Sequence, residues 1–229
     1  MRFRIAALVL ATSLGLAAPA QASPVTFTFV NGGSVSAFGY LVGKYNGLQG
    51  ASPNQTAVLL NCVDFFHHVS NQQTWSANIS SLSTGAGVGV DTRYSGGNAL
   101  SLYRQAAWLT TQYASIPLNA PNYNQQVGDI QATIWGLFPH IPAPPSPILN
   151  TTWASQAAAH ANDASYGFFV VSDVVTRTNG VDNPNSVQEF VIYDPALETT
   201  VVSTPEPASM VLLGTGLVGL MGVRLRRRK

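Results

Sequence analysis

Charged side chains are scarce in this chain of 229 residues, at 9% of the total. Positive charge is scarcer still between the two ends, because seven of the eleven Lys and Arg residues lie in the first four or the last six positions. The four that remain, against nine acidic residues, give the central region a net charge of −5. Nucleic-acid binding depends on Lys and Arg that neutralise phosphates, so this composition argues against a nucleic-acid partner.

Several common catalytic motifs are also missing. The sequence has no Gly-x-Ser-x-Gly, no phosphate-binding glycine loop followed by Lys, and no His-Glu-x-x-His. Asp64, His67 and His68 form the one local group of metal-ligand types, but adjacent histidines on a strand point to opposite sides. We therefore expect no metal, no cofactor and no turnover enzyme.

The N-terminus has the order of a secretory signal peptide. Arg2 and Arg4 precede an apolar run over 5–18, and Ala20 and Ala22 form a small-residue cleavage site. The run is shorter than the roughly 20 apolar residues that span a bilayer. We predict a signal peptide over 1–22, which signal peptidase cuts after Ala22.

The C-terminus combines an apolar segment with a basic end. Residues 208–223 carry no charge, and four glycines among them make this a weakly helical segment, which suits a temporary stop. The basic residues that follow are Arg224, Arg226, Arg227, Arg228 and Lys229. Because Lys and Arg gather on the cytoplasmic side of a span, we predict a single C-terminal transmembrane helix with this cluster inside.

Directly before that segment stands the tripeptide Pro205, Glu206, Pro207. The order of tripeptide, short glycine-bearing span and arginine cluster resembles the PEP-CTERM sorting signal. That resemblance implies processing by an exosortase in a Gram-negative bacterium. It also implies a transient stay in the inner membrane, followed by the cell surface or the extracellular matrix. A plain tail anchor that is never cut is the alternative.

The region 23–203, between the signal peptide and the sorting tail at 204–229, is long enough for one domain. Alternating or β-branched patterns predict strands over 25–30, 36–42, 56–69, 166–175 and 187–193. Helical spacing predicts helices over 100–113, 124–138 and 153–162. The order of strands, helices and strands predicts an α+β fold, with a sandwich-like or barrel-like β scaffold and a helical insertion.

The chain has a single cysteine, Cys62, so it forms no internal disulfide. One interpretation is an inert buried thiol, since free cysteine is often buried. Others are a disulfide between chains and a nucleophile activated by one of the four histidines. The histidines are His67, His68, His140 and His160. On the strand predicted over 56–69, Cys62 shares a face with His68 and not with His67, and we expect both histidines to be exposed.

A further interpretation starts from Gln131 in the second predicted helix. At about 100° per residue, Gln131 falls within the apolar stripe that includes Ile130, Ile134 and Trp135. A buried primary amide needs partners for its carbonyl and its amino group. Hydrogen bonds to the backbone would satisfy it, and so would attack of the Cys62 thiolate on the Gln131 carbonyl, which expels ammonia and leaves a thioester.

The segments NCVDFF (61–66), YRQAAWLTTQY (103–113) and IQATIWGLF (130–138) resemble the thioester domains of bacterial surface adhesins. In that family the cysteine lies early, on the β part, and the glutamine lies in a Gln-x-x-x-Trp helix. The resemblance implies a Cys62–Gln131 cross-link that attaches the protein once to an amine or hydroxyl nucleophile. The target would be an extracellular polysaccharide or a surface protein. The alternative is a noncovalent matrix-binding or structural protein with an inert Cys62.

Overall fold

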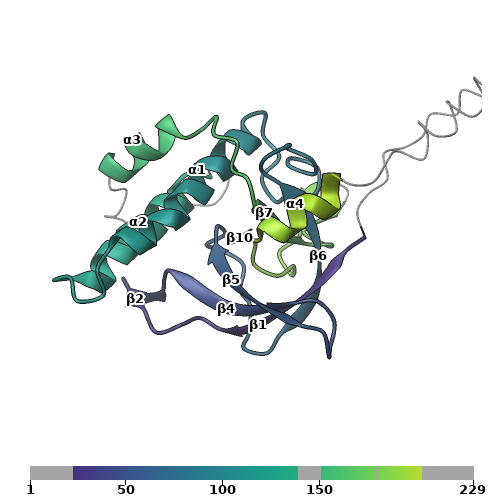
Figure 1. The fold of residues 1–229 in the computed structure, drawn as a ribbon, viewed down its shortest axis with the longest axis horizontal. Helices are drawn as coiled ribbons and strands as arrows, with labels where there is room; N and C mark the ends of the chain where they lie inside the picture. Colours follow the sequence, from purple (N-terminus) through teal and green to yellow (C-terminus); the bar gives the residue numbers. More distant parts are fainter. Residues whose placement is uncertain (1–22, 139–150, 179, 203–229) are drawn as a thin grey trace, which may run out of the picture. The chain divides into compact units, whose positions relative to one another are not determined.

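The computed structural model describes residues 23–138, 151–178 and 180–202 (Figure 1). The described residues up to Thr200 belong to one compact unit. The signal peptide predicted over 1–22 and the tail predicted over 204–229 lie outside the described residues.

Six strands close into a barrel in the order β1, β4, β5, β10, β7, β6, and every neighbouring pair is antiparallel. They are β1 (Val25–Asn31), β4 (Lys44–Gln49), β5 (Thr56–Cys62), β6 (Thr74–Ser81), β7 (Phe168–Asp173) and β10 (Phe190–Tyr193). Two short hairpins lie outside the barrel sheet, β2 (Ser36–Ala37) with β3 (Tyr40–Leu41) and β8 (Arg177–Thr178) with β9 (Val181–Asp182). Closure pairs both edges of the barrel sheet, which removes the exposed edges of an open sheet.

Aromatic rings from four strands fill the inside of the barrel. Phe29 lies 5.7 Å from Tyr45 and 6.4 Å from Phe190 between ring centroids, and Trp75 lies 5.9 Å from Phe190. Phe27 stacks on Trp75 at 5.8 Å. Phe27 and Phe29 are two residues apart on β1, so the pleat of the strand turns both rings to the same side. These contacts explain why residues 25–30, which alternate apolar and polar side chains, form a strand of the barrel.

Three helices lie between β6 and β7, and they are grouped on one side of the barrel in Figure 1. They are α1 (Ala99–Gln112), α2 (Tyr123–Gly136) and α3 (Thr151–Ala159), and a short 3₁₀ turn (Tyr113–Ser115) follows α1. A fourth helix, α4 (Pro195–Val202), follows β10. The predicted α+β class, with a barrel-like scaffold and a helical insertion, is confirmed.

Two predicted strands are wrong in part. The strand over 36–42 is instead the β2–β3 hairpin, because Phe38 and Gly39 take positive φ angles of 56° and 85° and reverse the chain. The strand over 56–69 stops at Cys62. Beyond it, the Asp64 side chain accepts hydrogen bonds from the backbone N–H groups of Phe66 (3.1 Å) and His67 (3.3 Å), a local turn that competes with a strand.

Within the described residues, no helix is both long and apolar enough to cross a membrane. The transmembrane helix predicted over 208–223 falls outside those residues.

Adjacent leucines on β5 provide a test of the barrel core. Leu60 is fully buried, whereas Leu59 points to the outside with 47% of its surface exposed. We expect Leu60→Ala to lower the free energy of unfolding by about 2–5 kcal/mol, since it removes buried methyl groups and leaves a cavity. Leu59→Ala should change it by less than about 0.5 kcal/mol. Urea denaturation of both variants measures the difference, and equal effects would contradict the assigned faces of β5.

Candidate functional site

Cys62 is the last residue of β5 and is fully buried. Its thiol donates to the backbone carbonyl of Asp64 at 3.0 Å. Two side chains donate to its sulfur: the indole Nε1 of Trp135 at 3.3 Å and the amide Nε2 of Gln188 at 2.8 Å. The sulfur therefore lies where three elements meet, namely the end of β5, helix α2 and the segment before β10.

Gln131 lies on α2, beside Cys62, and is also fully buried. Its amide Nε2 donates to the backbone carbonyl of Cys62 at 2.8 Å. Its Oε1 accepts two hydrogen bonds, from the backbone N–H of Gly43 at 3.3 Å and from the hydroxyl of Tyr113 at 3.0 Å. The structure thus brings together the two residues that the sequence singled out, and it holds the carboxamide by both ends.

The two donors to Gln131 Oε1 come from different parts of the chain. Gly43 precedes β4 with a φ of 87°, a conformation that favours glycine, and this turn directs its N–H at Gln131. Tyr113 follows directly on α1. Burial raises the pKa of the Tyr113 phenol, with smaller contributions from Tyr45 and Cys62, so its hydroxyl stays protonated and remains a donor.

The thiol of Cys62 is also kept protonated. Burial raises its pKa, and the nearby negative charge of Asp64 raises it further, while the hydrogen bond from Trp135 acts in the opposite direction. A thiolate would carry an uncompensated charge into a buried site. An attack by this sulfur would therefore require the thiol proton to move to a neighbouring group.

An ion-pair network holds the loop that follows Cys62. Asp64 pairs with Nε of Arg93 and with Nδ1 of His67, each at 2.8 Å. Arg93 also contacts His67 Nε2 at 3.0 Å and pairs with Asp182. Burial disfavours the Asp64 carboxylate, but the hydrogen bond from His67 and the charge of Arg93 outweigh it and lower its pKa. Because the Asp64 backbone carbonyl accepts from both the Cys62 thiol and Gln188, this network positions the sulfur.

The prediction for the two histidines needs correction. His67 is only 8% exposed and belongs to the Asp64–Arg93 network, whereas His68 is exposed as expected. The argument from a shared strand face fails because β5 ends at Cys62. No group of three or more His, Cys, Asp or Glu residues that could hold a metal is found in the described part of the chain.

Sequence reasoning did not find three residues of the site: Gly43, Tyr113 and Gln188. Tyr113 ends the helix predicted over 100–113. Nothing in the sequence indicated that its hydroxyl would reach α2. Gly43 contributes only its backbone. Gln188 is separated from Cys62 by 126 positions, and its contact depends on the pairing of Phe190 with Cys62 in the barrel.

Comparison with known proteins identifies one region. Residues 203–228 match the family described as PEP-CTERM protein-sorting motif. This match confirms the predicted sorting signal, which implies export, processing by an exosortase and a surface or extracellular location. Comparisons with curated proteins and with solved structures each gave no match. They give no support to the thioester-domain resemblance, so the Cys62–Gln131 bond stays a prediction.

The Asp64 network predicts a specific pH dependence. Because the pKa of Asp64 is lowered by folding, its stabilisation is present above the unfolded-state pKa of about 3.9 and is lost as the pH falls below it. We expect Asp64→Asn to cost about 3 kcal/mol near neutral pH and progressively less under acid conditions. Urea denaturation over a pH series measures this difference.

Asp163→Asn is the matched control, because Asp163 has a 54% exposed side chain outside the network. It should have little effect at any pH. A cost of Asp64→Asn that stayed constant or grew on acidification would contradict the assigned role of the network.

Proposed function

We propose that the exported domain forms an internal thioester between Cys62 Sγ and Gln131 Cδ and uses it once for covalent attachment outside the cell. The observation that supports this most directly is the Gln131 carboxamide, which bonds the Cys62 carbonyl while two donors hold its oxygen. The target is an amine or hydroxyl of an extracellular polysaccharide or a surface protein. Signal peptidase and exosortase process the chain, and this processing ends its transient location in the inner membrane.

Formation of the bond balances without any added reactant. The sulfur attacks Cδ of Gln131, the thiol proton moves to Nε2, and the C–N bond breaks to release ammonia. Negative charge develops on Oε1 during this attack. The Gly43 N–H and the Tyr113 hydroxyl already point at this oxygen, which is the arrangement of an oxyanion hole.

The surroundings of the sulfur suit the same step. The N–H groups of Trp135 and Gln188 donate to Sγ and stabilise the partial negative charge that develops as its proton departs. After the reaction, the buried thiol and the buried primary amide are both replaced by a neutral thioester. Full burial of both residues excludes water, which protects the thioester from hydrolysis.

In the attachment step, the target nucleophile replaces the sulfur at Cδ. An incoming amine attacks Cδ, the C–S bond breaks, and the departing sulfur takes up a proton from the amine. An amide to Gln131 and a free Cys62 thiol remain. Because this bond is not renewed, the protein acts once and is not a turnover enzyme.

Access of the nucleophile requires a movement. An aromatic group packs against Trp135, the donor to Cys62 Sγ: the ring of Phe65 lies 4.8 Å from that of Trp135 and 5.0 Å from that of Tyr40 on β3. The ring of Phe66 lies 5.1 Å from that of Phe65, and Tyr40 and Phe66 are the exposed members of the group, at 38% and 42%. Displacement of the β2–β3 hairpin would uncover the carbonyl on this side.

Intact mass of the purified full chain tests the bond. We expect a mass lower by one ammonia than the sequence requires after allowance for processing, and a thiol that resists alkylation after denaturation. Cys62→Ala and Gln131→Ala should each abolish the deficit once the substitution itself is counted. Treatment with methylamine should add one methylamine to Gln131 and free the Cys62 thiol.

Gln105→Ala is the matched control, since Gln105 is another buried helical glutamine, whose carboxamide bonds Ser101 in its own helix. It should keep the deficit. A full mass with an alkylatable thiol in the unsubstituted chain would overturn the proposal and leave Cys62 as an inert buried thiol.

The two donors predict a kinetic effect. Tyr113→Phe keeps the buried ring but removes one of the two groups that stabilise the charge on Oε1. Starting from chain recovered unfolded with the Gln131 amide intact, we expect the loss of ammonia after refolding to slow by about a hundredfold, as for removal of one oxyanion-hole donor. Mass spectrometry at successive times after refolding measures it, and an unchanged rate would show that Tyr113 has no part in the step.

A further inference from the structure

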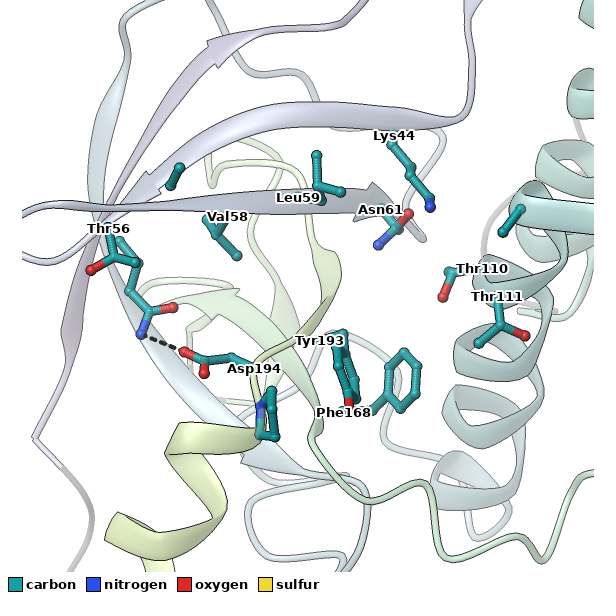
Figure 2. A pocket seen from close by; sticks show the side chains of 14 residues that line it. Lys44, Thr56, Val58, Leu59, Asn61, Thr110, Thr111, Phe168, Tyr193 and Asp194 are labelled. Carbon is teal, nitrogen blue, oxygen red and sulfur yellow. Dashed lines mark hydrogen bonds between the residues drawn. The ribbon is translucent and has the colours of Figure 1, made fainter. Parts of the chain in front are cut away.

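The outer wall of the barrel carries a second candidate site, a cleft of about 590 Å³. Figure 2 shows its walls, with β5 on one side, the end of α1 on another, and the start of α4 below. Its volume falls in the range of roughly 300–1,000 Å³ that is usual for small-molecule sites. Asn61 lines it, whereas Cys62 follows on the opposite face of β5, so the cleft is separate from the Cys62–Gln131 site.

An aromatic platform forms one wall of the cleft. Tyr193 exposes 58% of its surface, and its ring lies 4.9 Å from that of Phe168, tilted by 51°. Gly167 supports the ring from behind: its φ is 75°, and a Cβ there would come within 2.8 Å of Tyr193 Cε2. The tyrosine ring is therefore exposed and yet held in place, which lowers the entropic cost of packing a ligand against it.

Two buried amide oxygens in the same cleft lack a donor. Asn61 is 5% exposed; its Nδ2 donates to the carbonyl of Val191 at 3.0 Å, but its Oδ1 has no donor among the described residues. The carboxamide of Gln49 is bonded in the same one-sided way. Its Nε2 donates to Asp194 at 3.2 Å, and its Oε1 has no donor in the described part of the chain. Buried acceptors are costly to leave unpaired. Both need a partner that brings hydrogen-bond donors.

We propose that this cleft binds a neutral saccharide unit of an extracellular polysaccharide. The C–H face of a sugar ring packs against Tyr193. Rotation of the Asn61 and Gln49 side chains, whose oxygens are covered in the free protein, lets the sugar hydroxyls donate to Asn61 Oδ1 and Gln49 Oε1. Lys44 and Asp194 are the charged residues of the lining, one of each sign, so the cleft has no net charge that would select an ionic ligand. An acyl chain would fill the apolar part but has no donor for either oxygen.

The experiment is a calorimetric titration of the full chain, in a detergent without a sugar headgroup, with cellotetraose, maltotetraose and chitotetraose. We expect at least one of these to bind with one site per chain. Tyr193→Ala should weaken binding about tenfold, because the stacking surface is lost. Tyr193→Phe keeps the ring and should bind almost normally. Gln49→Met keeps the length of the side chain, removes the acceptor and should also weaken binding.

Tyr166→Ala is the matched control, since Tyr166 is a 74% exposed tyrosine outside the cleft, and it should bind normally. Cys62→Ala should also bind normally, so failure of the thioester and failure of the cleft give different results. Absence of binding by all three sugars at millimolar concentration would overturn the proposal. So would binding that neither Tyr193→Ala nor Gln49→Met weakens, or binding of decanoate without any of the sugars.

Discussion

The fully buried carboxamide of Gln131 is the constraint on which the site depends. Its nitrogen and oxygen are satisfied by three groups that are distant in sequence: the carbonyl of Cys62, the N–H of Gly43 and the hydroxyl of Tyr113. Loss of the Cys62 carbonyl would leave Nε2 without its acceptor, and loss of either donor would leave Oε1 with one hydrogen bond in place of two, so these contacts fix α2 against the end of β5. In the proposed thioester reaction, the same contacts would direct the Gln131 carbonyl, and the two donors would stabilise its oxygen.

The barrel strands and a buried ion-pair network position the sulfur of Cys62. Phe190 pairs with Cys62 across β10 and β5, which fixes the height of the sulfur at the end of the barrel. Beyond it, Arg93 and His67 hold the Asp64 carboxylate, while the backbone of Asp64 accepts the thiol. In a chain with few charges, a buried ion-pair network is concentrated on the loop next to its single cysteine. The network orients the sulfur without contacting it through a charged group.

The sequence predicted correctly those strands and helices whose own residues show a clear apolar period, and it missed those that depend on contacts with distant segments. The strand over 25–30 and the helices over 100–113 and 124–138 have strong periodicity, and Gln131 lies in the apolar stripe as predicted. Strands β4 and β6 were missed because Gly47, Asn78 and several serines interrupt their patterns, and only barrel closure makes them strands. The roles of Gly43, Tyr113 and Gln188 were invisible because each depends on long-range register. The boundary of β5 was misplaced because Asp64 bonds its own backbone.

The sorting motif indicates an exported protein. Under our two proposals, its domain would hold a saccharide and attach once. The central claim is the bond between Cys62 and Gln131, and a crystal structure of the purified protein at high resolution tests it most directly. The account predicts continuous density from Sγ to Cδ, no Nε2 atom, and a carbonyl oxygen that still accepts from Gly43 and Tyr113. A separate thiol beside an intact carboxamide that bonds the Cys62 carbonyl would contradict it.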